Sequence, residues 1–484
     1  MESEAKELPS YKLRSHPDKL LIDHLQRVGD LCSNTIEEKA LNIEEADLLK
    51  EAAYIIGITH DMGKATRFFQ EYIMEKDEKK KRSLKAKDVT HHGLLSAFFT
   101  YAVIKEYLSQ TGRKGGLADY LPVLSLLAVK RHHGNLLNAM DEVKDIDADK
   151  EKILKLAEEQ IGSMEDRKEE IQLLLPTLLA RMNINIKIDI DNIINYILNG
   201  ALKDIRRREK SLVRALSESG NLYPYFISQF IYSALLDADK TDAGLGGVNL
   251  DRIDLSSVLV DDFRAAKGFS TSKNNLNSLR NQIYEEAMER IKGWDLNEKI
   301  ISLNVPTGTG KTLAALSLSL KLKERLENER NIKPRIIYAL PFLSIIDQNY
   351  RVFEEVILKP SASQDSRMLL KHHHLADVKF KIEESEYEVD KSLLLLEGWN
   401  AEIIVTTFWQ LFNTLFSNRN KQLRKFNKLA NSIIILDEVQ AVPHQYWPLI
   451  HDSLKLLAEK FNSYIVFMTA TQPLIFDEAK GEIK

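Results

Sequence analysis

Histidines and aspartates recur in the first half of the chain, on or at the ends of apolar segments with helical spacing. His24 opens one such segment, His60-Asp61 ends another, and Asp237 and Asp239 lie in a third. A helical bundle can project all of these side chains into one interior pocket, as bundles do in metal sites. Imidazole and carboxylate ligands favour a transition metal, and two such ions activate a water and hold a phosphate. These residue types therefore predict metal-dependent phosphodiester hydrolysis.

Further imidazoles lie between these positions. One pair is His91-His92, and the other is His132-His133 beside a glycine, where two neighbouring imidazoles fit a binuclear site. The order His, His-Asp, His, His-His, Asp resembles the HD metal-dependent phosphohydrolase superfamily. The expected ions are manganese, nickel, cobalt or iron, with magnesium as a further candidate. The metal ligands that the resemblance implies are His24, His60, Asp61, His92, His132, His133 and Asp239.

Two of these ligands have neighbours that could replace them. Asp239 is preferred to Asp237 because Ala238-Asp239 looks like the Ala-Asp pair of that superfamily, and residues two apart on a helix face different ways. His92 is preferred to His91 on similar grounds of helix facing. From the sequence, both alternatives stay open.

A lysine follows the His-Asp doublet. Lys64, three residues after Asp61, resembles the phosphate-facing lysine of nuclease members of the HD superfamily. The expected catalytic residues of this half are therefore Asp61 and Lys64. A rival metal cluster at 372–374 is less favourable, because three successive histidines point in different directions.

The second half of the chain is organised around a glycine-rich turn. Apolar residues at 300–305 precede it, and an apolar run with helical spacing starts at Leu313, which predicts strand, loop and helix in that order. Such a loop directs backbone N–H groups at a phosphate, its lysine adds a point charge, and the threonine hydroxyl reaches Mg²⁺. The predicted nucleotide-binding residues are Thr307, Gly308, Thr309, Gly310, Lys311 and Thr312.

Two carboxylates end another predicted strand. The apolar run at 432–436 leads into Asp437-Glu438. An acid at the carboxyl end of a strand, beside a phosphate loop, is where magnesium and the attacking water are held. We therefore expect Asp437 to bind Mg²⁺ with ATP and Glu438 to act on the water.

These segments resemble the superfamily 2 helicases. The nucleotide loop at 307–312 is followed by an acidic box at 437–440 and a coupling motif at 469–471. Residues 338–348 and 404–411 look like the segments with which that family touches the nucleic-acid backbone. Arg280 and Gln282 resemble its adenine-reading segment, while Trp409 and Phe412 are expected in a helix core rather than stacked on bases.

The elements that must position these residues define the fold class. The histidine-bearing half is helical by period, and the other half alternates apolar strands with helices. We predict an all-α HD-type bundle followed by an α/β RecA-like P-loop domain with a parallel sheet. The expected domains are residues 1–250, with a helical insertion at about 141–220, a linker at 251–277, and residues 278–484.

Composition limits the class of protein. The 484 residues are 44% hydrophobic and 29% charged, which is typical of a globular protein. The net charge of −4 gives no overall basic footprint, so nucleic-acid contacts must come from local patches. No run reaches the roughly 18 apolar residues of a membrane span, no secretory signal is recognisable, and Cys32 has no partner for a disulfide. A cytoplasmic protein without membrane contact is expected.

An HD domain ahead of a superfamily 2 helicase core resembles the CRISPR-associated helicase-nuclease of type I interference. The resemblance implies single-stranded DNA of an R-loop as substrate, a guide-RNA surveillance complex as partner, and 3′-to-5′ translocation with ATP. The motor is expected to be incomplete, because only residues 472–484 follow the coupling motif. Either the second helicase lobe is truncated or a separate chain supplies it. The alternatives are an HD phosphohydrolase acting on nucleotides and a catalytically idle DNA-binding or recruitment fragment.

Overall fold

The computed structural model forms two compact units. The first comprises Met1–Glu37, Glu45–Ala243 and Asn418–Asn420, and the second comprises Glu38–Glu44, Gly244–Ser417 and Lys421–Lys484. The structure describes residues 11–245, 251–269, 275–306, 308–358, 365–373, 381–382, 385–386, 394–469, 475–477 and 482–483.

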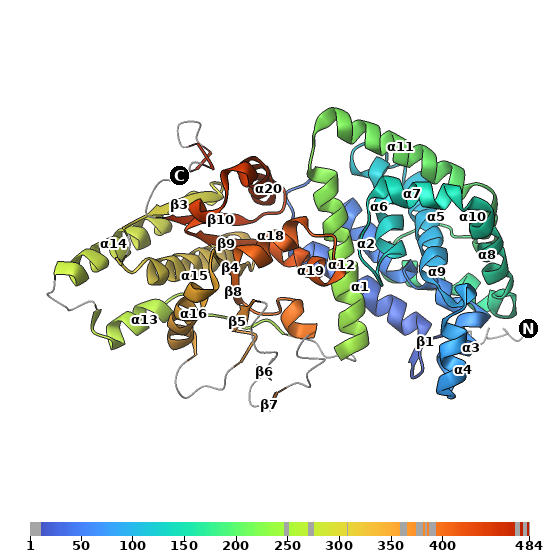
Figure 1. Cartoon of the computed structure of the whole chain (residues 1–484), viewed down its shortest axis with the longest axis horizontal. Helices are drawn as coiled ribbons and strands as arrows, with labels where there is room; N and C mark the ends of the chain where they lie inside the picture. The colour runs from blue at the N-terminus through green and yellow to red at the C-terminus, as the bar shows by residue number, and fades with distance from the viewer. Residues whose placement is uncertain are drawn as a thin grey trace, which may run out of the picture. The chain divides into compact units, whose positions relative to one another are not determined.

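The first unit is a helical bundle, drawn from blue to green in Figure 1. Its central helices include α2 (Ala46–Thr59), α5 (Gly93–Thr111) and α6 (Leu117–Lys130), which are largely buried, and α5 packs against both of the others. Helices that are apolar on most faces must be surrounded by other helices. The other elements are β1 (Arg14–His16), β2 (Lys19–Leu20), α1 (Leu21–Glu38), α3 (Arg67–Met74), α4 (Glu78–Lys85), α7 (Ala139–Ala148), α8 (Lys150–Gly162), α9 (Lys168–Arg181), α10 (Ile190–Asn199), α11 (Ala201–Ser219) and α12 (Tyr223–Leu245), with short 3-10 turns at Met62–Ala65, Asp88–Thr90 and Glu165–Arg167.

The second unit is built on a six-stranded sheet with the order β3-β10-β9-β4-β8-β5, in which every neighbouring pair is parallel. The inner strands β8, β9 and β10 are buried along their whole length and β4 in all but its first residue, as expected when helices cover both faces. The strands are β3 (Ile300–Asn304), β4 (Arg335–Leu340), β5 (Leu369–His372), β8 (Ile403–Thr407), β9 (Ser432–Asp437) and β10 (Tyr464–Thr469), with a separate pair β6 (Lys381–Ile382) and β7 (Ser385–Glu386).

Helices connect these strands and pack on the sheet (Figure 1). For example, α15 contacts β9, and α20 contacts β10. The helices are α13 (Leu259–Ala266), α14 (Asn275–Lys292), α15 (Lys311–Arg330), α16 (Leu343–Ile357), α18 (Phe408–Phe416), α19 (Asn420–Leu423) and α20 (Trp447–Glu459), with 3-10 turns at Phe426–Leu429, Val439–Ala441 and His444–Tyr446. The predicted fold class, a helical bundle followed by a RecA-like parallel sheet, is confirmed.

The register of the sheet brings the second group of motifs to one edge. β10 lies between β3 and β9, with Met468 opposite Asp437 and Thr469 opposite Asn304. Because all three strands are parallel, their carboxyl ends meet at the same edge. The glycine-rich loop after β3 and the two acids at the end of β9 therefore lie side by side.

The segment expected as a linker, residues 251–277, differs from that expectation. It contains α13 and the start of α14, and Val260 of α13 is fully buried in the core of the second unit. Apolar residues around it, including Leu255, Leu259 and Phe263, pack on the same core and explain why the segment folds. Among the described helices, none has the length and hydrophobicity needed to cross a bilayer.

A buried charge network fixes one end of the sheet. Glu402, which is 2% exposed, accepts hydrogen bonds from Arg252 at 2.8 and 2.6 Å and from Lys323 at 2.7 Å.

Removing the charge of a buried ion pair leaves its partners uncompensated and typically costs about 3–5 kcal/mol. We therefore expect Glu402→Gln to lower the free energy of unfolding of this unit by about that amount in urea titrations. The control is Glu327→Gln, since Glu327 is partly exposed and lies 4.0 Å from the same lysine; equal losses in both variants would contradict the prediction.

Candidate metal centre and nucleotide site

Five segments of the helical bundle bring the predicted ligands together. α1 contributes His24, the end of α2 contributes His60-Asp61, His92 precedes α5, His132-His133 follow α6, and α12 contributes Asp239. Their ligand atoms form two groups, in each of which all atoms lie within 4.8 Å of one another. One group is His24, His60, Asp61 and Asp239, and the other is Asp61, His92, His132 and His133.

The first group gathers around one oxygen of Asp61. Its Oδ2 lies 3.1 Å from Nε2 of His24 and 3.4 Å from Nε2 of His60. Oδ1 of Asp239 lies 3.5 and 3.6 Å from the same two nitrogens. Two imidazoles and two carboxylates thus face one point inside the bundle.

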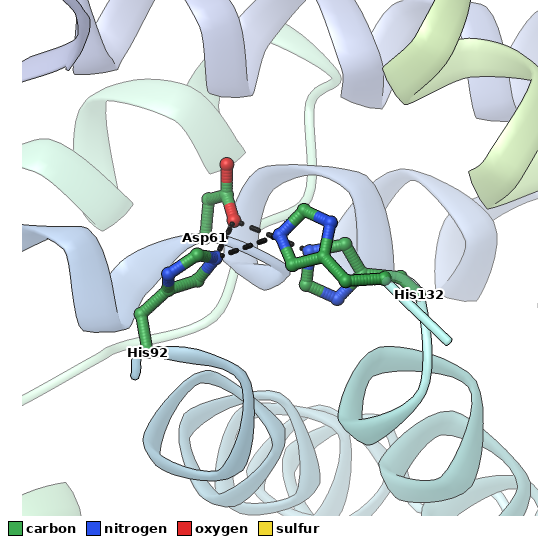
Figure 2. A group of neighbouring side chains, drawn as sticks. Asp61, His92 and His132 are labelled. Carbon is green, nitrogen blue, oxygen red and sulfur yellow. Dashed lines mark hydrogen bonds and ion pairs between the residues drawn. The ribbon is translucent and has the colours of Figure 1, made fainter. Parts of the chain in front are cut away.

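The second group gathers around the other oxygen of Asp61. Its Oδ1 lies 3.0 Å from Nε2 of His92 and 3.4 Å from Nε2 of His132, and Figure 2 shows both rings facing the carboxylate. Nε2 of His133, an exposed residue, lies 3.0 Å from Nε2 of His92. Asp61 is therefore shared by the two groups.

The charges of the site suit a cation. Burial opposes ionisation of Asp61, but Lys64 and His60 outweigh it and hold its pKa well below the usual range. Burial would also lower the pKa of His60, yet Asp61 and Asp239 raise it to about 10. The buried carboxylates thus draw a proton onto an imidazole, and a metal ion can take the place of that proton. Burial lowers the pKa of His92 to about 4, so this imidazole is neutral and able to coordinate.

Three buried atoms support the fit to metal ions. Nε2 of His60, Oδ1 of Asp61 and Nε2 of His132 have no hydrogen-bond partner among the described residues. Unpaired buried polar atoms are costly, so their presence in the two ligand groups indicates missing ligands. Divalent ions in the two groups would satisfy all three atoms.

The Nδ1 atoms of three buried ligand histidines each contact a hydrogen-bond acceptor, which fixes the orientation of the rings. Nδ1 of His60 lies 2.7 Å from the Gly57 carbonyl, and Nδ1 of His132 lies 2.6 Å from the Val129 carbonyl. Nδ1 of His24 lies 2.5 Å from Oδ2 of Asp242. The sequence prediction did not include Asp242, although its position three residues after Asp239 places both on one face of α12.

Lys64, expected from the resemblance to HD nucleases to face a phosphate, lies beside the first ligand group. It lies in the turn Met62–Ala65, is 5% exposed, and its Nζ is 2.6 Å from Oδ2 of Asp61. His91 and Asp237, the alternatives to His92 and Asp239, are in neither ligand group. His91 is exposed, and its Nε2 lies 3.2 Å from the Lys85 carbonyl.

The nucleotide loop and the acidic box meet at the carboxyl edge of the sheet. Nζ of Lys311 lies 2.8 Å from Oε1 of Glu438, and the Thr312 hydroxyl donates to Oδ1 of Asn349 at 2.8 Å. Gly308 and Gly310 both have positive φ, at 79° and 86°, which a side chain would disfavour. Thr309 is buried and donates to the Pro306 carbonyl, and Thr307 lies outside the described residues.

Asp437 has one free and one bound oxygen. The Tyr338 hydroxyl donates to Oδ2 at 2.7 Å, whereas Oδ1 is buried without a hydrogen-bond partner among the described residues. Burial raises the pKa of Asp437 to about 6, so it is ionised at neutral pH. The free oxygen suits a magnesium ion brought in with a nucleotide.

Some predicted residues are not brought to the site. Gln282 is exposed, donates a hydrogen bond to Glu286 at 2.9 Å, and does not line the cavity of about 120 Å³ beside the loop. Arg280 lines this cavity and donates a hydrogen bond to the Gly308 carbonyl at 2.8 Å. The helix face that meets α15 carries Arg280 and Tyr284, which turns Gln282 outward. Trp409 was expected in a helix core, yet it is 69% exposed.

Two predicted motifs extend beyond the described residues. In the coupling motif at 469–471, Thr469 ends β10, and residues 470 and 471 lie outside the part of the chain that the structure describes. In the rival cluster at 372–374, Nδ1 of His372 accepts from Trp399 Nε1 at 3.1 Å, and residue 374 is outside the described ranges.

Comparisons with known proteins agree with these two sites. The family model described as Cas3, HD domain matches residues 19–187, and the model described as DEAD/DEAH box helicase matches residues 279–478. The CRISPR-associated nuclease/helicase Cas3 of Haloferax volcanii is 26% identical over 492 residues, an alignment covering 96% of this chain and 50% of that protein.

Solved structures show the same fold. The crystal structure of T. fusca Cas3-AMPPNP aligns with a TM-score of 0.52 at 16% identity, covering 96% of this chain and 51% of that chain. The Cas3-ADP structure aligns with a TM-score of 0.52 at 17% identity and the same coverage. This chain thus spans about half the length of the relatives that it matches. Residues 19–187 are thus similar to the Cas3 HD domain, and residues 279–478 are similar to the DEAD/DEAH box helicases.

Proposed function

We propose that this chain is a metal-dependent nuclease that cleaves single-stranded DNA, joined to an ATP-binding helicase domain. The observation that carries the proposal is the pair of ligand groups that share Asp61. Divalent ions bound there would polarise a phosphodiester and activate a water for its hydrolysis. The related Haloferax volcanii protein is described as a nuclease/helicase, which supports both halves of the proposal.

The chain's own residues have distinct parts in this reaction. The two groups hold the ions from inside the bundle, and the neutral His92 provides a nitrogen lone pair at neutral pH. The ammonium group of Lys64 carries the positive charge that a DNA phosphate would meet beside Asp61. His133 is exposed, so the second group opens toward solvent and admits a polymer.

The helicase domain gives the nuclease its substrate class. An ATP-binding domain of the DEAD/DEAH type beside the HD domain favours a nucleic-acid polymer over a free nucleotide. The proposed role is degradation of the displaced DNA strand of an R-loop, in CRISPR defence with a guide-RNA surveillance complex. ATP with Mg²⁺, held by Lys311 and Asp437, would drive 3′-to-5′ movement along that strand.

The test compares substrates under matched conditions. The purified chain is incubated with end-labelled single-stranded DNA, with duplex DNA and with deoxynucleotides, in the presence of Mn²⁺, Co²⁺, Ni²⁺, Fe²⁺, Mg²⁺ or EDTA. We expect cleavage of single-stranded DNA with a transition metal, without ATP, and none with EDTA. Hydrolysis of deoxynucleotides with intact DNA would identify a nucleotide phosphohydrolase instead, and a chain that binds no metal would refute the proposal.

A further inference from the structure

We infer that Asp242 is a positioning residue that holds His24 with its Nε2 lone pair facing the first metal group. The inference rests on the proposed metal centre and concerns how that centre is kept in shape. Asp242 belongs to neither ligand group. It acts through His24.

The contacts of Asp242 connect three elements of the bundle. The side chain is fully buried on α12, and its Oδ2 lies 2.5 Å from both Nδ1 of His24 on α1 and Nζ of Lys19 on β2. Its Oδ1 lies 3.2 Å from Nε of Arg27, one turn after His24. Lys19 therefore shares Oδ2 with His24, and Arg27 approaches the other oxygen.

Two ion pairs compensate the charge of Asp242 inside the bundle. Nζ of Lys19 lies 2.5 Å from Oδ2, and Nε of Arg27 lies 3.2 Å from Oδ1. A buried carboxylate needs such partners, because an unpaired buried charge is costly. Asp242 is therefore placed and paired as an acceptor for the Nδ1–H of His24.

An ionised acceptor at Nδ1 decides which nitrogen of His24 is free. A neutral imidazole has one N–H and one lone pair, and a carboxylate takes the N–H. Asp242 is the nearer carboxylate, at 2.5 Å from Nδ1 against 3.1 Å between Nε2 and Asp61. With an ion in the first group, the N–H of His24 would lie at Nδ1 and the lone pair at Nε2. Such carboxylate–histidine pairs orient metal ligands and raise their basicity.

His24 differs in this respect from the other buried ligand rings. Nδ1 of His60 and of His132 faces a backbone carbonyl, which carries no net charge. Of these three described rings, His24 is the one whose Nδ1 faces a carboxylate. Loss of Asp242 should weaken the ion held by His24 and Asp239 and spare the ion held by His92 and His132.

The experiment measures Mn²⁺ binding to the full chain by isothermal titration calorimetry. We expect wild type to bind two ions, and Asp242→Ala to weaken one of them by about 10–100-fold while the other is unchanged. The Mn²⁺ affinity of Asp242→Asn should lie between those of wild type and Asp242→Ala, because the amide oxygen still accepts a hydrogen bond from Nδ1 of His24 but carries no charge. This second variant also preserves shape, so the test stands if the alanine variant does not fold.

A double-mutant cycle separates positioning from general destabilisation. If Asp242 acts through His24, then Asp242→Ala in a His24→Ala background should cause no further loss of Mn²⁺ affinity. Asp204→Asn is the matched control. Asp204 is another buried carboxylate of the bundle, with Lys105 at 3.2 Å and Arg207 at 2.7 Å, and its loss should lower the melting temperature but leave both ions bound.

Two results would overturn the inference. One is unchanged binding of both ions in Asp242→Ala and Asp242→Asn, and the other is an additive loss in the double mutant. A wild-type chain that binds no Mn²⁺, Co²⁺, Ni²⁺ or Fe²⁺ would instead refute the metal centre itself and the inference with it.

Discussion

Replacing Asp61 with alanine is expected to remove both metal ions and to reduce cleavage of single-stranded DNA to background. Its two oxygens face different ligand groups, at 3.1 Å from His24 and 3.0 Å from His92. No other residue belongs to both groups. Metal content by mass spectrometry and cleavage of end-labelled DNA measure the two effects, and circular dichroism shows whether the bundle remains folded.

A pair of neighbouring histidines provides the control for this experiment. His92 belongs to the second ligand group, whereas the adjacent His91 is exposed and faces the Lys85 carbonyl. His92→Ala should lower metal content and cleavage, and His91→Ala should leave both at the wild-type level. If a folded Asp61→Ala variant still cleaved DNA in a metal-dependent way, the proposed centre would be wrong.

Replacing Lys311 with alanine is expected to weaken ATP binding by about 10–100-fold, because hydrogen bonds to charged groups contribute about 1.5–3 kcal/mol. The lysine follows Gly310 at the start of α15, beside the two acids of β9. A fluorescent ATP analogue titrated in the presence of Mg²⁺ measures the affinity.

The same variant separates the two sites. DNA cleavage by Lys311→Ala without ATP should equal that of wild type, because the metal centre lies within the other unit. Lys292→Ala serves as the control, since this lysine is exposed on α14 and forms an ion pair with the exposed Glu289. Equal ATP affinity in the wild type and the Lys311 variant would show that Lys311 of this loop does not hold ATP as proposed.

Much of the second unit could be predicted because strand direction fixes where strand-end residues meet. The runs ending at Asn304 and Asp437 were recognisable as strands, and their parallel pairing with β10 places the strand ends at one edge. The helical first unit could be predicted from apolar spacing. The ligand assignment stays a prediction, although the structure brings every residue of the predicted set into the two groups.

Features that depend on packing could not be obtained from spacing alone. Whether Arg280 or Gln282 faces the loop depends on which side of α14 packs against α15, and both positions have polar residues. Trp409 is apolar and was expected in a core, but the fold leaves its face of α18 uncovered. Asp242 was overlooked because its role depends on a contact with His24 that is 218 residues away.

The sharing of Asp61 would couple the two ions of the centre. Its Oδ2 faces the group with Asp239, and its Oδ1 faces the group with His133. Two divalent ions held on opposite sides of one carboxylate would repel each other, so the second would bind more weakly than the first. The free metal concentration around the protein would then determine what fraction of molecules carries a complete pair.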